Sequence, residues 1–257
     1  MIRVGVFGAG GRMGATVCDA VLAAPDLELV AAVDPFHGGE TVRGTELTIG
    51  AGWEALEAAK PDVAVDFTNI DGARMNLRWC AAEGVHAVVG TTGFDEGELS
   101  TLGTMFADSQ ANAVIAPNFA IGAVMMMRFA ELAAPYFDSV EIIEMHHDQK
   151  IDAPSGTSIA TAQRIAAASK DWSEDPTTKV VAEGARGGTV EGVPVHALRV
   201  RGMVASQEVL FGTTGQSLSI RHDTYDRSSF MPGVLLAVRK VAATPGLTLG
   251  LDALLGF

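Results

Sequence analysis

The sequence predicts an α/β protein: a Rossmann-like, doubly wound parallel sheet domain followed by an α+β domain with a mixed sheet. Three observations lead to this prediction. Through residues 1–117, short apolar strands alternate with helices, the pattern of a parallel sheet covered on both faces. A glycine-rich turn joins the first strand to the first helix. Beyond residue 190, three strands follow one another without helices between them.

In the first domain, β-branched and apolar runs predict strands at 2–7, 27–34, 62–68, 85–93 and 112–118. Helices are expected at 13–24, 53–60 and 71–83, and one more after Asp95. Gly84 has the position of a C-terminal capping glycine, and Asp95 with Glu98 resembles a capping box. Each helix therefore has a predicted start or stop.

In the second domain, helices are expected at 119–134 and 158–170, and strands at 139–147, 193–200, 206–212 and 216–222. The GTTG turn at 212–215 predicts a hairpin between the last two strands. Met125, Met126 and Met127 are interpreted as core residues. A final helix near 228–243 is expected to pack on the first domain. The predicted domains are therefore 1–117 with 227–257, for the dinucleotide, and 118–226, for substrate binding and oligomerisation.

Composition restricts the classes of partner. The 257 residues are 48% hydrophobic and carry a formal net charge of −13, which argues against nucleic acid or an anionic membrane as the main partner. The two cysteines lack zinc-site spacing and are interpreted as buried thiols of a reduced protein. The chain enters a strand at once, and no apolar run has the length of a membrane span. We therefore expect a cytoplasmic protein.

The segment VGVFGAGGRMG ends a strand and opens a helix, where glycines let the backbone approach a pyrophosphate. Its spacing is G-x-x-G-x-x-G, through Gly8, Gly11 and Gly14. A tight turn alone could use these glycines, but Asp34 ends the next strand, about 20 residues further on, where a carboxylate binds the adenosine ribose. That carboxylate would repel a 2′-phosphate, so NADH should bind at least as well as NADPH. Arg12 is a candidate phosphate contact that keeps dual use open.

Two further loops, GTTG at 90–93 and APNF at 116–119, leave the carboxyl ends of predicted strands. Doubly wound sheets bind their ligands at that edge. Either loop could be an ordinary turn, but together they are interpreted as the border of the nicotinamide.

The string EMHHDQKIDAPSGT at 144–157 gathers titratable groups beside a turn. Neighbouring side chains on a strand face opposite sides, so His146 and His147 cannot share one role, and the spacing is not that of a zinc site. Either histidine alone could be structural. Ser155 or Thr157 can cap the next helix, whose first N–H groups, at Gly156 and Thr157, would form a carboxylate cradle beside Lys150. A cradle, a cation and a histidine proton donor together suggest reduction of a small carboxylated substrate.

EMHHDQKIDAPSGT resembles the signature of the 4-hydroxy-tetrahydrodipicolinate reductase (dihydrodipicolinate reductase) family of diaminopimelate and lysine biosynthesis. VGVFGAGGRMG, VVGTTGF, IAPNFAIGAV and RHDTYDRSSFMPGV are similar to that family as well, so the resemblance runs nearly end to end. It implies reduction of 4-hydroxy-tetrahydrodipicolinate, a small dicarboxylate, to tetrahydrodipicolinate with NADH or NADPH and no metal. It also implies a homotetramer assembled through the sheet of the second domain.

The resemblance also assigns residue roles. It implies catalytic roles for His146 and Lys150, and substrate binding by His147, Ser155, Gly156 and Thr157. It implies cofactor binding by Gly8, Ala9, Gly10, Gly11, Arg12, Met13, Asp34, Gly90, Thr91, Thr92, Ala116, Pro117, Asn118 and Phe119. The sequence departs from the family at Asp148 and Gln149, where many relatives carry basic residues, and no arginine follows Asp34.

Two other functions fit the same residues. One is another two-domain NAD(P)-dependent amino-acid dehydrogenase, such as an aspartate or homoserine dehydrogenase. The other is a non-catalytic dinucleotide sensor that uses the second domain for protein contacts. A substrate panel that follows oxidation of the reduced nicotinamide distinguishes them.

Overall fold

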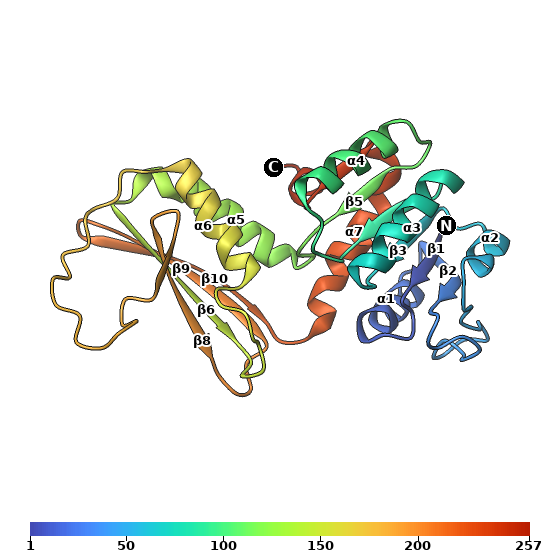
Figure 1. Cartoon of the computed structure of the whole chain (residues 1–257), viewed down its shortest axis with the longest axis horizontal. Coiled ribbons are helices and arrows are strands. Elements are labelled where there is room, and N and C mark those ends of the chain that lie inside the picture. Colours follow the sequence, from blue (N-terminus) through green and yellow to red (C-terminus); the bar gives the residue numbers. More distant parts are fainter. The chain divides into compact units, whose positions relative to one another are not determined.

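The computed structural model describes the whole chain, Met1–Phe257, and the chain divides into two compact units (Figure 1). The first comprises Met1–Ala120 and Arg227–Phe257, and the second comprises Ile121–Asp226. Phe119, which the sequence grouping places in the second domain, lies in the first unit. Its ring packs against that of Phe67, with the ring centroids 5.7 Å apart.

The first unit is built on a six-stranded sheet in which every pair is parallel. Its order is β11-β5-β4-β3-β1-β2. The strands are β1 (Ile2–Phe7), β2 (Leu27–Val33), β3 (Val63–Asp66), β4 (His86–Val89), β5 (Ala113–Ile115) and β11 (Leu247–Leu249). The strand order reverses direction beside β1, which is the place where a doubly wound sheet binds its ligand. The sequence does not predict β11, because three residues are too few to show a period.

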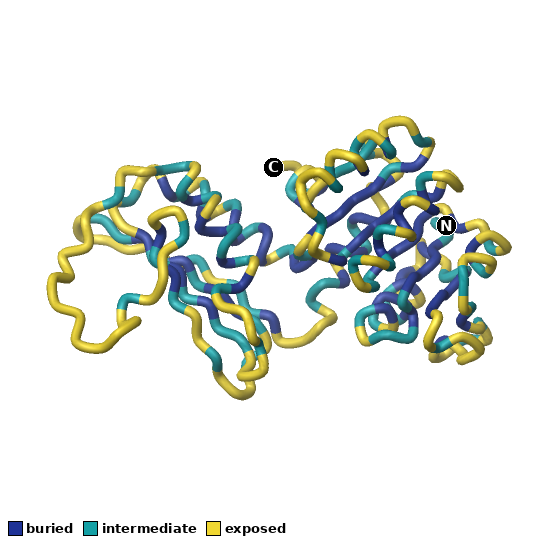
Figure 2. Tube along the Cα trace, viewed as in Figure 1, coloured by how far each residue is buried: buried dark blue, intermediate teal, exposed yellow.

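Helices cover both faces of this sheet (Figure 1). They are α1 (Arg12–Ala23), α2 (Glu54–Ala59), α3 (Ile70–Glu83), α4 (Glu96–Ala107), α7 (Met231–Lys240) and α8 (Asp252–Leu255), with short 3-10 turns η2 (Arg227–Phe230) and η3 (Val241–Ala243). The predicted caps are confirmed: Gly84 is left-handed with φ 72°, and Asp95 and Glu98 form a reciprocal capping box. The buried residues run along the strands (Figure 2).

The second unit packs two helices on a mixed sheet of order β10-β9-β6-β8-β7. Its elements are α5 (Ile121–Ala133), η1 (Ala134–Tyr136), β6 (Ser139–His146), α6 (Gly156–Ala168), β7 (Gly188–Val190), β8 (Val193–Arg199), β9 (Ala205–Thr213) and β10 (Gln216–Thr224). Only the β6–β8 pair is parallel. The predicted hairpin is present, with Thr213 opposite Gln216 and Gly215 at φ 79°. The sequence does not predict β7, and α6 begins two residues earlier than expected.

The core of the second unit lies between the sheet and the two helices. Ile142 of β6 and Ile165 of α6 are fully buried in it, together with Phe211 of β9. Met126 and Met127 of α5 are buried as predicted, whereas Met125 is half-buried. One face of β6, the even-numbered residues, therefore points toward the helices.

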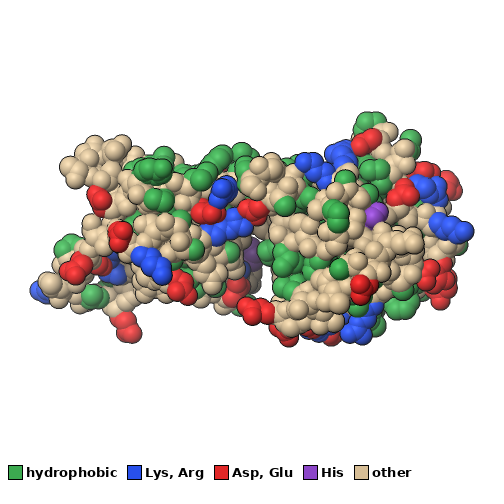
Figure 3. All heavy atoms as spheres, turned by 90° about the horizontal axis from the view of Figure 1, so that it is seen from above, with side chains coloured by type: hydrophobic (Ala, Val, Ile, Leu, Met, Phe, Trp, Pro, Cys, Tyr) green, Lys and Arg blue, Asp and Glu red, His purple; other side chains and the backbone are tan.

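The surface carries charges of both signs. On the face drawn in Figure 3, acidic and basic side chains are interspersed and form no continuous basic patch. None of the helices combines the length and the apolar character that crossing a bilayer requires.

Candidate active site

The glycine turn between β1 and α1 closes only with glycine. Gly8 has φ 69°, and a Cβ added at Gly14 would lie 1.9 Å from the Gly8 carbonyl oxygen. Gly11 precedes the helix and makes no side-chain cap, so no side chain occupies the first N–H groups of α1. A helix start of this kind presents backbone donors and the positive end of the dipole to an anion.

A buried carboxylate lies beside this turn. Asp34, which is 5% exposed, follows β2 and accepts N–H hydrogen bonds from Gly10 at 3.1 Å and Phe36 at 2.9 Å. His37 Nδ1 lies 3.1 Å from Asp34 Oδ1. The two groups form an ion-pair contact whose geometry is not that of a hydrogen bond. Burial alone would raise the pKa of Asp34, but His37 and the two N–H donors outweigh it and lower that pKa. The Asp34 carboxylate in turn raises the pKa of His37.

The two later loops lie at the same edge of the sheet. Gly90 follows β4, and a Cβ there would lie 2.1 Å from the ring of Phe67. Thr91 donates its hydroxyl to the Thr68 carbonyl at 2.9 Å, so that loop is tied to the end of β3. The segment 116–119 follows β5, the neighbour of β4. The structure therefore brings the sequence-predicted cofactor residues to the carboxyl ends of β1, β2, β4 and β5.

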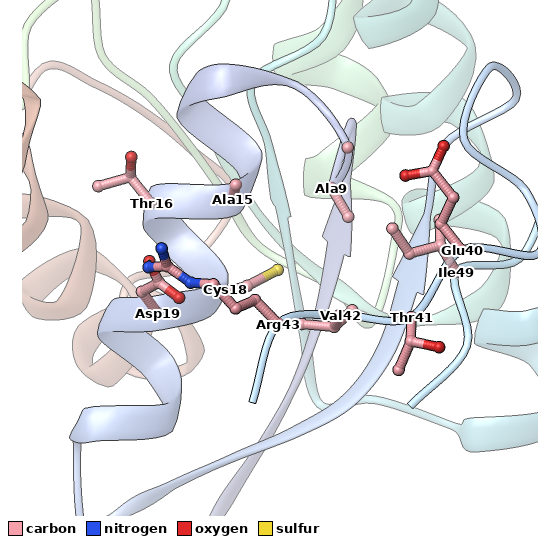
Figure 4. A pocket seen from close by; sticks show the side chains of 11 residues that line it. Ala9, Ala15, Thr16, Cys18, Asp19, Glu40, Thr41, Val42, Arg43 and Ile49 are labelled. Atoms are coloured by element: carbon pink, nitrogen blue, oxygen red, sulfur yellow. The ribbon is translucent and has the colours of Figure 1, made fainter. Parts of the chain in front are cut away.

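A hollow of about 400 Å³ lies beside the glycine turn (Figure 4). Ala9 and Gly10 form one wall, and Arg43 spans it to pair with Asp19 of α1. Glu40 also lines the hollow, which therefore has two carboxylates against one guanidinium. This charge does not suit a pyrophosphate, which fits the N–H groups of the turn instead.

In the second unit, His146 ends β6 and contacts a carboxylate on its own face. Glu144, two residues earlier and fully buried, accepts a hydrogen bond from His146 Nδ1. Arg199 lies opposite His146 in the β6–β8 register and donates to both oxygens of Glu144, at 3.0 and 3.1 Å. Burial alone would raise the pKa of Glu144, but the hydrogen bonds from His146 and Arg199 hold it below its ordinary value.

The PSGT turn is anchored by polar side chains. Ser155 caps α6 by accepting the Ser158 N–H at 3.2 Å, as predicted, and its own N–H donates to Glu144 at 3.2 Å. Ser158 donates its hydroxyl to Gln207 Oε1 at 2.7 Å, and Gln207 Nε2 donates to the Thr161 hydroxyl at 2.8 Å. This buried network fixes the start of α6 to β6 and β9.

His147 lies just beyond the end of β6. Its Nδ1 accepts the N–H of Gln149 at 3.2 Å, so its hydrogen-bonding role differs from that of His146.

The lysine of the same loop is paired. Lys150 Nζ lies 2.8 Å from each carboxylate oxygen of Asp152, which lowers the pKa of Asp152. Arg201 donates to Asp148 at 3.1 Å. A positive charge therefore lies beside Asp148, one of the two positions where this loop departs from the basic residues of many relatives.

The sequence interpretation missed four of these residues: His37, Glu144, Arg199 and Arg201. A signal existed for Glu144, because residues i and i+2 of a strand share one face and a carboxylate two residues before a histidine can contact it. Arg199 and Arg201 lie on or just beyond another strand, and only the pairing of β6 with β8 brings them here.

Comparison with known families matches both units. The family model described as "Dihydrodipicolinate reductase, N-terminus" matches residues 2–119, and "Dihydrodipicolinate reductase, C-terminus" matches residues 122–255. Together they cover nearly the whole chain.

Individual relatives and a solved structure agree. The chain is 53% identical to 4-hydroxy-tetrahydrodipicolinate reductase of Thermobifida fusca, over 100% of both chains. It is 50% identical to the Corynebacterium urealyticum protein of that name, over 100% of this chain and 99% of that one. The dipicolinate-bound dihydrodipicolinate reductase of Paenisporosarcina sp. TG-14 is 40% identical, with a TM-score of 0.90, over 98% of this chain and 99% of that one. The chain therefore belongs to the 4-hydroxy-tetrahydrodipicolinate reductase (dihydrodipicolinate reductase) family.

Proposed function

We propose that this chain reduces 4-hydroxy-tetrahydrodipicolinate to tetrahydrodipicolinate with NAD(P)H, the reductase step of diaminopimelate and lysine biosynthesis. Family membership supports the reaction. The observation that carries the proposal is that one buried carboxylate, Glu144, holds both His146 and the PSGT turn. A proton donor and an anion cradle with one shared anchor suit a carboxylated substrate that must gain a proton.

In this proposal the first unit binds the cofactor. The glycine turn fits a pyrophosphate, because its close packing excludes side chains and leaves the start of α1 without a side-chain cap. Asp34 binds the adenosine ribose, and the loops at 90–92 and 116–119 border the nicotinamide. NADH binds at least as well as NADPH, because the buried Asp34 carboxylate repels a 2′-phosphate. When bound, the reduced nicotinamide supplies a hydride to C4 of the substrate.

The second unit binds the substrate. The backbone N–H groups of Gly156 and Thr157, at the positive end of α6, hold a substrate carboxylate. Lys150 places an ammonium group beside the substrate carboxylate. That carboxylate must compete with Asp152 for the ammonium. His147 is the second histidine available to the substrate.

Protonation falls to His146. Loss of water from the 4-hydroxy substrate gives a conjugated cyclic imine. Hydride addition at C4 of this imine leaves electron density on the adjacent carbon, which must take up a proton. His146 Nδ1 is engaged by Glu144, so Nε2 is the nitrogen that delivers the proton. Lys150 supports this transfer electrostatically or by donating a proton itself.

We also propose that the chain forms a homotetramer through the sheet of the second unit. Leu198 of β8 and Leu218 of β10 are 38% and 36% exposed, and Val200 and Val204 beside these strands are also exposed. An apolar set of this kind on one sheet suits burial against another copy. A monomeric mass in sedimentation equilibrium at micromolar concentration would exclude this assembly.

A coupled assay tests the reaction. Pyruvate and aspartate semialdehyde are condensed by a separate synthase, and this protein and NADH are then added. We expect rapid loss of NADH absorbance only when every component is present. Turnover with an amino-acid substrate instead would identify an amino-acid dehydrogenase, and NADH binding without any turnover would identify a dinucleotide sensor.

The residue roles are tested with a His146→Gln, Lys150→Ala double variant. We expect kcat to fall by about 100-fold or more, because general acid–base catalysis contributes at least that much. NADH affinity should stay unchanged, since neither residue belongs to the first unit. Lys179→Ala, which removes an exposed lysine elsewhere in the second unit, is the control and should retain full activity. Full turnover by the double variant would refute these roles.

A further inference from the structure

We propose that Glu144, held in place by Arg199, is a positioning residue that sets the tautomer and the ring orientation of His146. The inference rests on the proposed function, in which His146 delivers a proton. Neither residue is required to touch the substrate. They act through the histidine and through the start of α6.

The position of Glu144 follows from the strand. Val140, Ile142 and Glu144 are the buried residues of β6, and the alternation continues to His146, whose side chain is 16% exposed. Glu144 thus lies one pleat below His146 on the face covered by α6. A carboxylate with no exposed surface is retained there only if all its acceptor positions are used.

Four hydrogen bonds use those positions. Glu144 Oε1 accepts from Arg199 Nη2 at 3.0 Å and from the Ser155 N–H at 3.2 Å. Glu144 Oε2 accepts from Arg199 Nη1 at 3.1 Å and from His146 Nδ1. An ionised carboxylate offers about four lone-pair sites, so this one is saturated.

Saturation by donors fixes the charge and therefore the tautomer. The two-pronged contact with the Arg199 guanidinium keeps Glu144 ionised, in agreement with the lowered pKa of the carboxyl. An ionised carboxylate can only accept, so the hydrogen of neutral His146 must lie on Nδ1. The protonated ring carries its transferable proton on Nε2, and donation leaves the Nδ1–H tautomer that Glu144 stabilises.

Arg199 extends this control to the loop that carries Lys150. Its guanidinium donates to the carbonyl oxygens of Lys150 at 3.3 Å and Asp152 at 2.6 Å. The same arginine therefore fixes the carboxylate behind His146 and the backbone on both sides of residue 151. The ion pair between Glu144 and Arg199 therefore positions the histidine, the lysine loop and the capped turn together.

The chain offers a matched control on the same strand. Glu141 accepts from His196 at 2.5 Å and from Arg186 at 2.6 Å, so it also joins a histidine and an arginine. It lies on the opposite face of β6 and is 35% exposed. Glu141→Gln removes the same charge from the same kind of cluster without touching the proposed site.

The test compares Glu144→Gln with Glu141→Gln in the full-length protein. We expect Glu144→Gln to lower kcat by about 100-fold or more, because a lost orienting carboxylate leaves the wrong tautomer, while KM changes much less. Glu141→Gln should keep kcat within about twofold of the unchanged protein. Glu144→Asp keeps the negative charge on a side chain that is shorter by one methylene, and it should show an intermediate kcat. This variant replaces Glu144→Gln in the test if Glu144→Gln folds poorly.

Nitrogen NMR of ¹⁵N-histidine-labelled protein gives a readout that needs no substrate. His146, assigned by its loss in His146→Gln, should show a protonated Nδ1 at alkaline pH, and Glu144→Gln should shift it toward the other tautomer. Glu141→Gln should change only His196. An Nε2–H tautomer for His146 in the unchanged protein, or equal kcat in Glu144→Gln and Glu141→Gln, would overturn the inference. If the unchanged protein reduces no substrate while the NMR result holds, only the proposed function fails.

Discussion

Each unit places a buried carboxylate and a histidine beside the start of a helix, yet the two groups are built differently. Beside α1, Asp34 accepts the Gly10 N–H at 3.1 Å and contacts His37. Beside α6, Glu144 accepts the Ser155 N–H at 3.2 Å and a hydrogen bond from His146. The parallel ends there, because only Glu144 has an arginine, Arg199, bound to both of its oxygens.

The difference separates two ways of preparing a site. Asp34 has no guanidinium partner, so a ligand hydroxyl or the charge on His37 can change its surroundings. Glu144 is saturated by donors and cannot take part in binding; it can only hold its neighbours in place. In the proposed function, the first group contacts a ligand directly, whereas the second positions a residue that does so.

The first turns of α1 and α6 each contain a glycine, but the space around the two glycines differs. Gly14 of α1 is packed against backbone, and its added Cβ would meet the Gly8 carbonyl oxygen at 1.9 Å. Gly156 of α6 has no atom within 4 Å of an added Cβ. The glycine in the first turn is therefore required by the fold itself, whereas the glycine in the second leaves room for a ligand.

The largest effect is expected from Gly14→Ala. Because the obstructing atoms are backbone, the turn must move, and we expect NADH affinity to fall by about 100-fold and the free energy of unfolding to fall by about 1–3 kcal/mol. Isothermal titration with NADH and urea denaturation measure the two effects. Gly103→Ala is the control: it lies within α4 with nothing within 4 Å, and it should be stabilising by about 0.5–1 kcal/mol. Unchanged NADH affinity in Gly14→Ala would show that the turn is not the cofactor site.

Gly156→Ala should have a smaller and more selective effect. The methyl group meets no protein atom, so folding and NADH affinity should be unchanged. It would lie beside the N–H groups that we propose receive the substrate carboxylate. We therefore expect KM to rise about tenfold, or about 1.4 kcal/mol, with little change in kcat. Steady-state kinetics of the coupled reaction measure it.

The matched control for that variant is Gly188→Ala in β7, where an added Cβ also has nothing within 4 Å. Its KM should stay at the value of the unchanged protein. If the two glycine variants behave alike, the start of α6 does not bind the substrate and the comparison between the two turns loses its functional content.

Much of the fold follows from local sequence patterns. The β1–α1 turn is recognisable because its glycines lie close together in the chain, and the caps at Gly84 and Asp95 are recognisable for the same reason. Strands β7 and β11 are not, because each has three residues and gains its stability from pairing with a neighbour rather than from its own pattern.

The candidate site likewise contains some residues that the local sequence predicts and others that it does not. His146, Lys150 and Ser155 lie within one short string, so their proximity is visible in the sequence. Glu144 could have been found from the period of the strand. Arg199 could not, because its contact with Glu144 depends on the register of β6 against β8, which no local pattern specifies.

The smallest effect is expected from Asp34 and His37 beside α1. The partner of His37 there, the Asp34 carboxylate, is not saturated by hydrogen-bond donors as Glu144 is. The Asp34 carboxylate raises the pKa of His37, so the imidazolium is favoured below that raised value and is lost as the pH rises through it. Below it, the positive ring offsets the repulsion between Asp34 and a 2′-phosphate. The ratio of the KM for NADPH to the KM for NADH should therefore fall a few-fold from about pH 8.5 to pH 6, a range that brackets the ordinary histidine pKa of about 6.5.

The 2′-phosphate also loses charge near pH 6, since the second pKa of a phosphate monoester is about 6, and this loss would lower the same ratio. His37→Gln separates the two causes, because it removes the imidazole and leaves the phosphate as it was. If His37 is responsible, the variant should have a nearly flat ratio above about pH 7, where the phosphate is already ionised, while the unchanged protein still shows a slope. Equal slopes in both proteins would assign the effect to the phosphate. Asp34 would then repel the 2′-phosphate without an offset from the His37 ring, and the histidine beside α1 would have no part in the choice of cofactor.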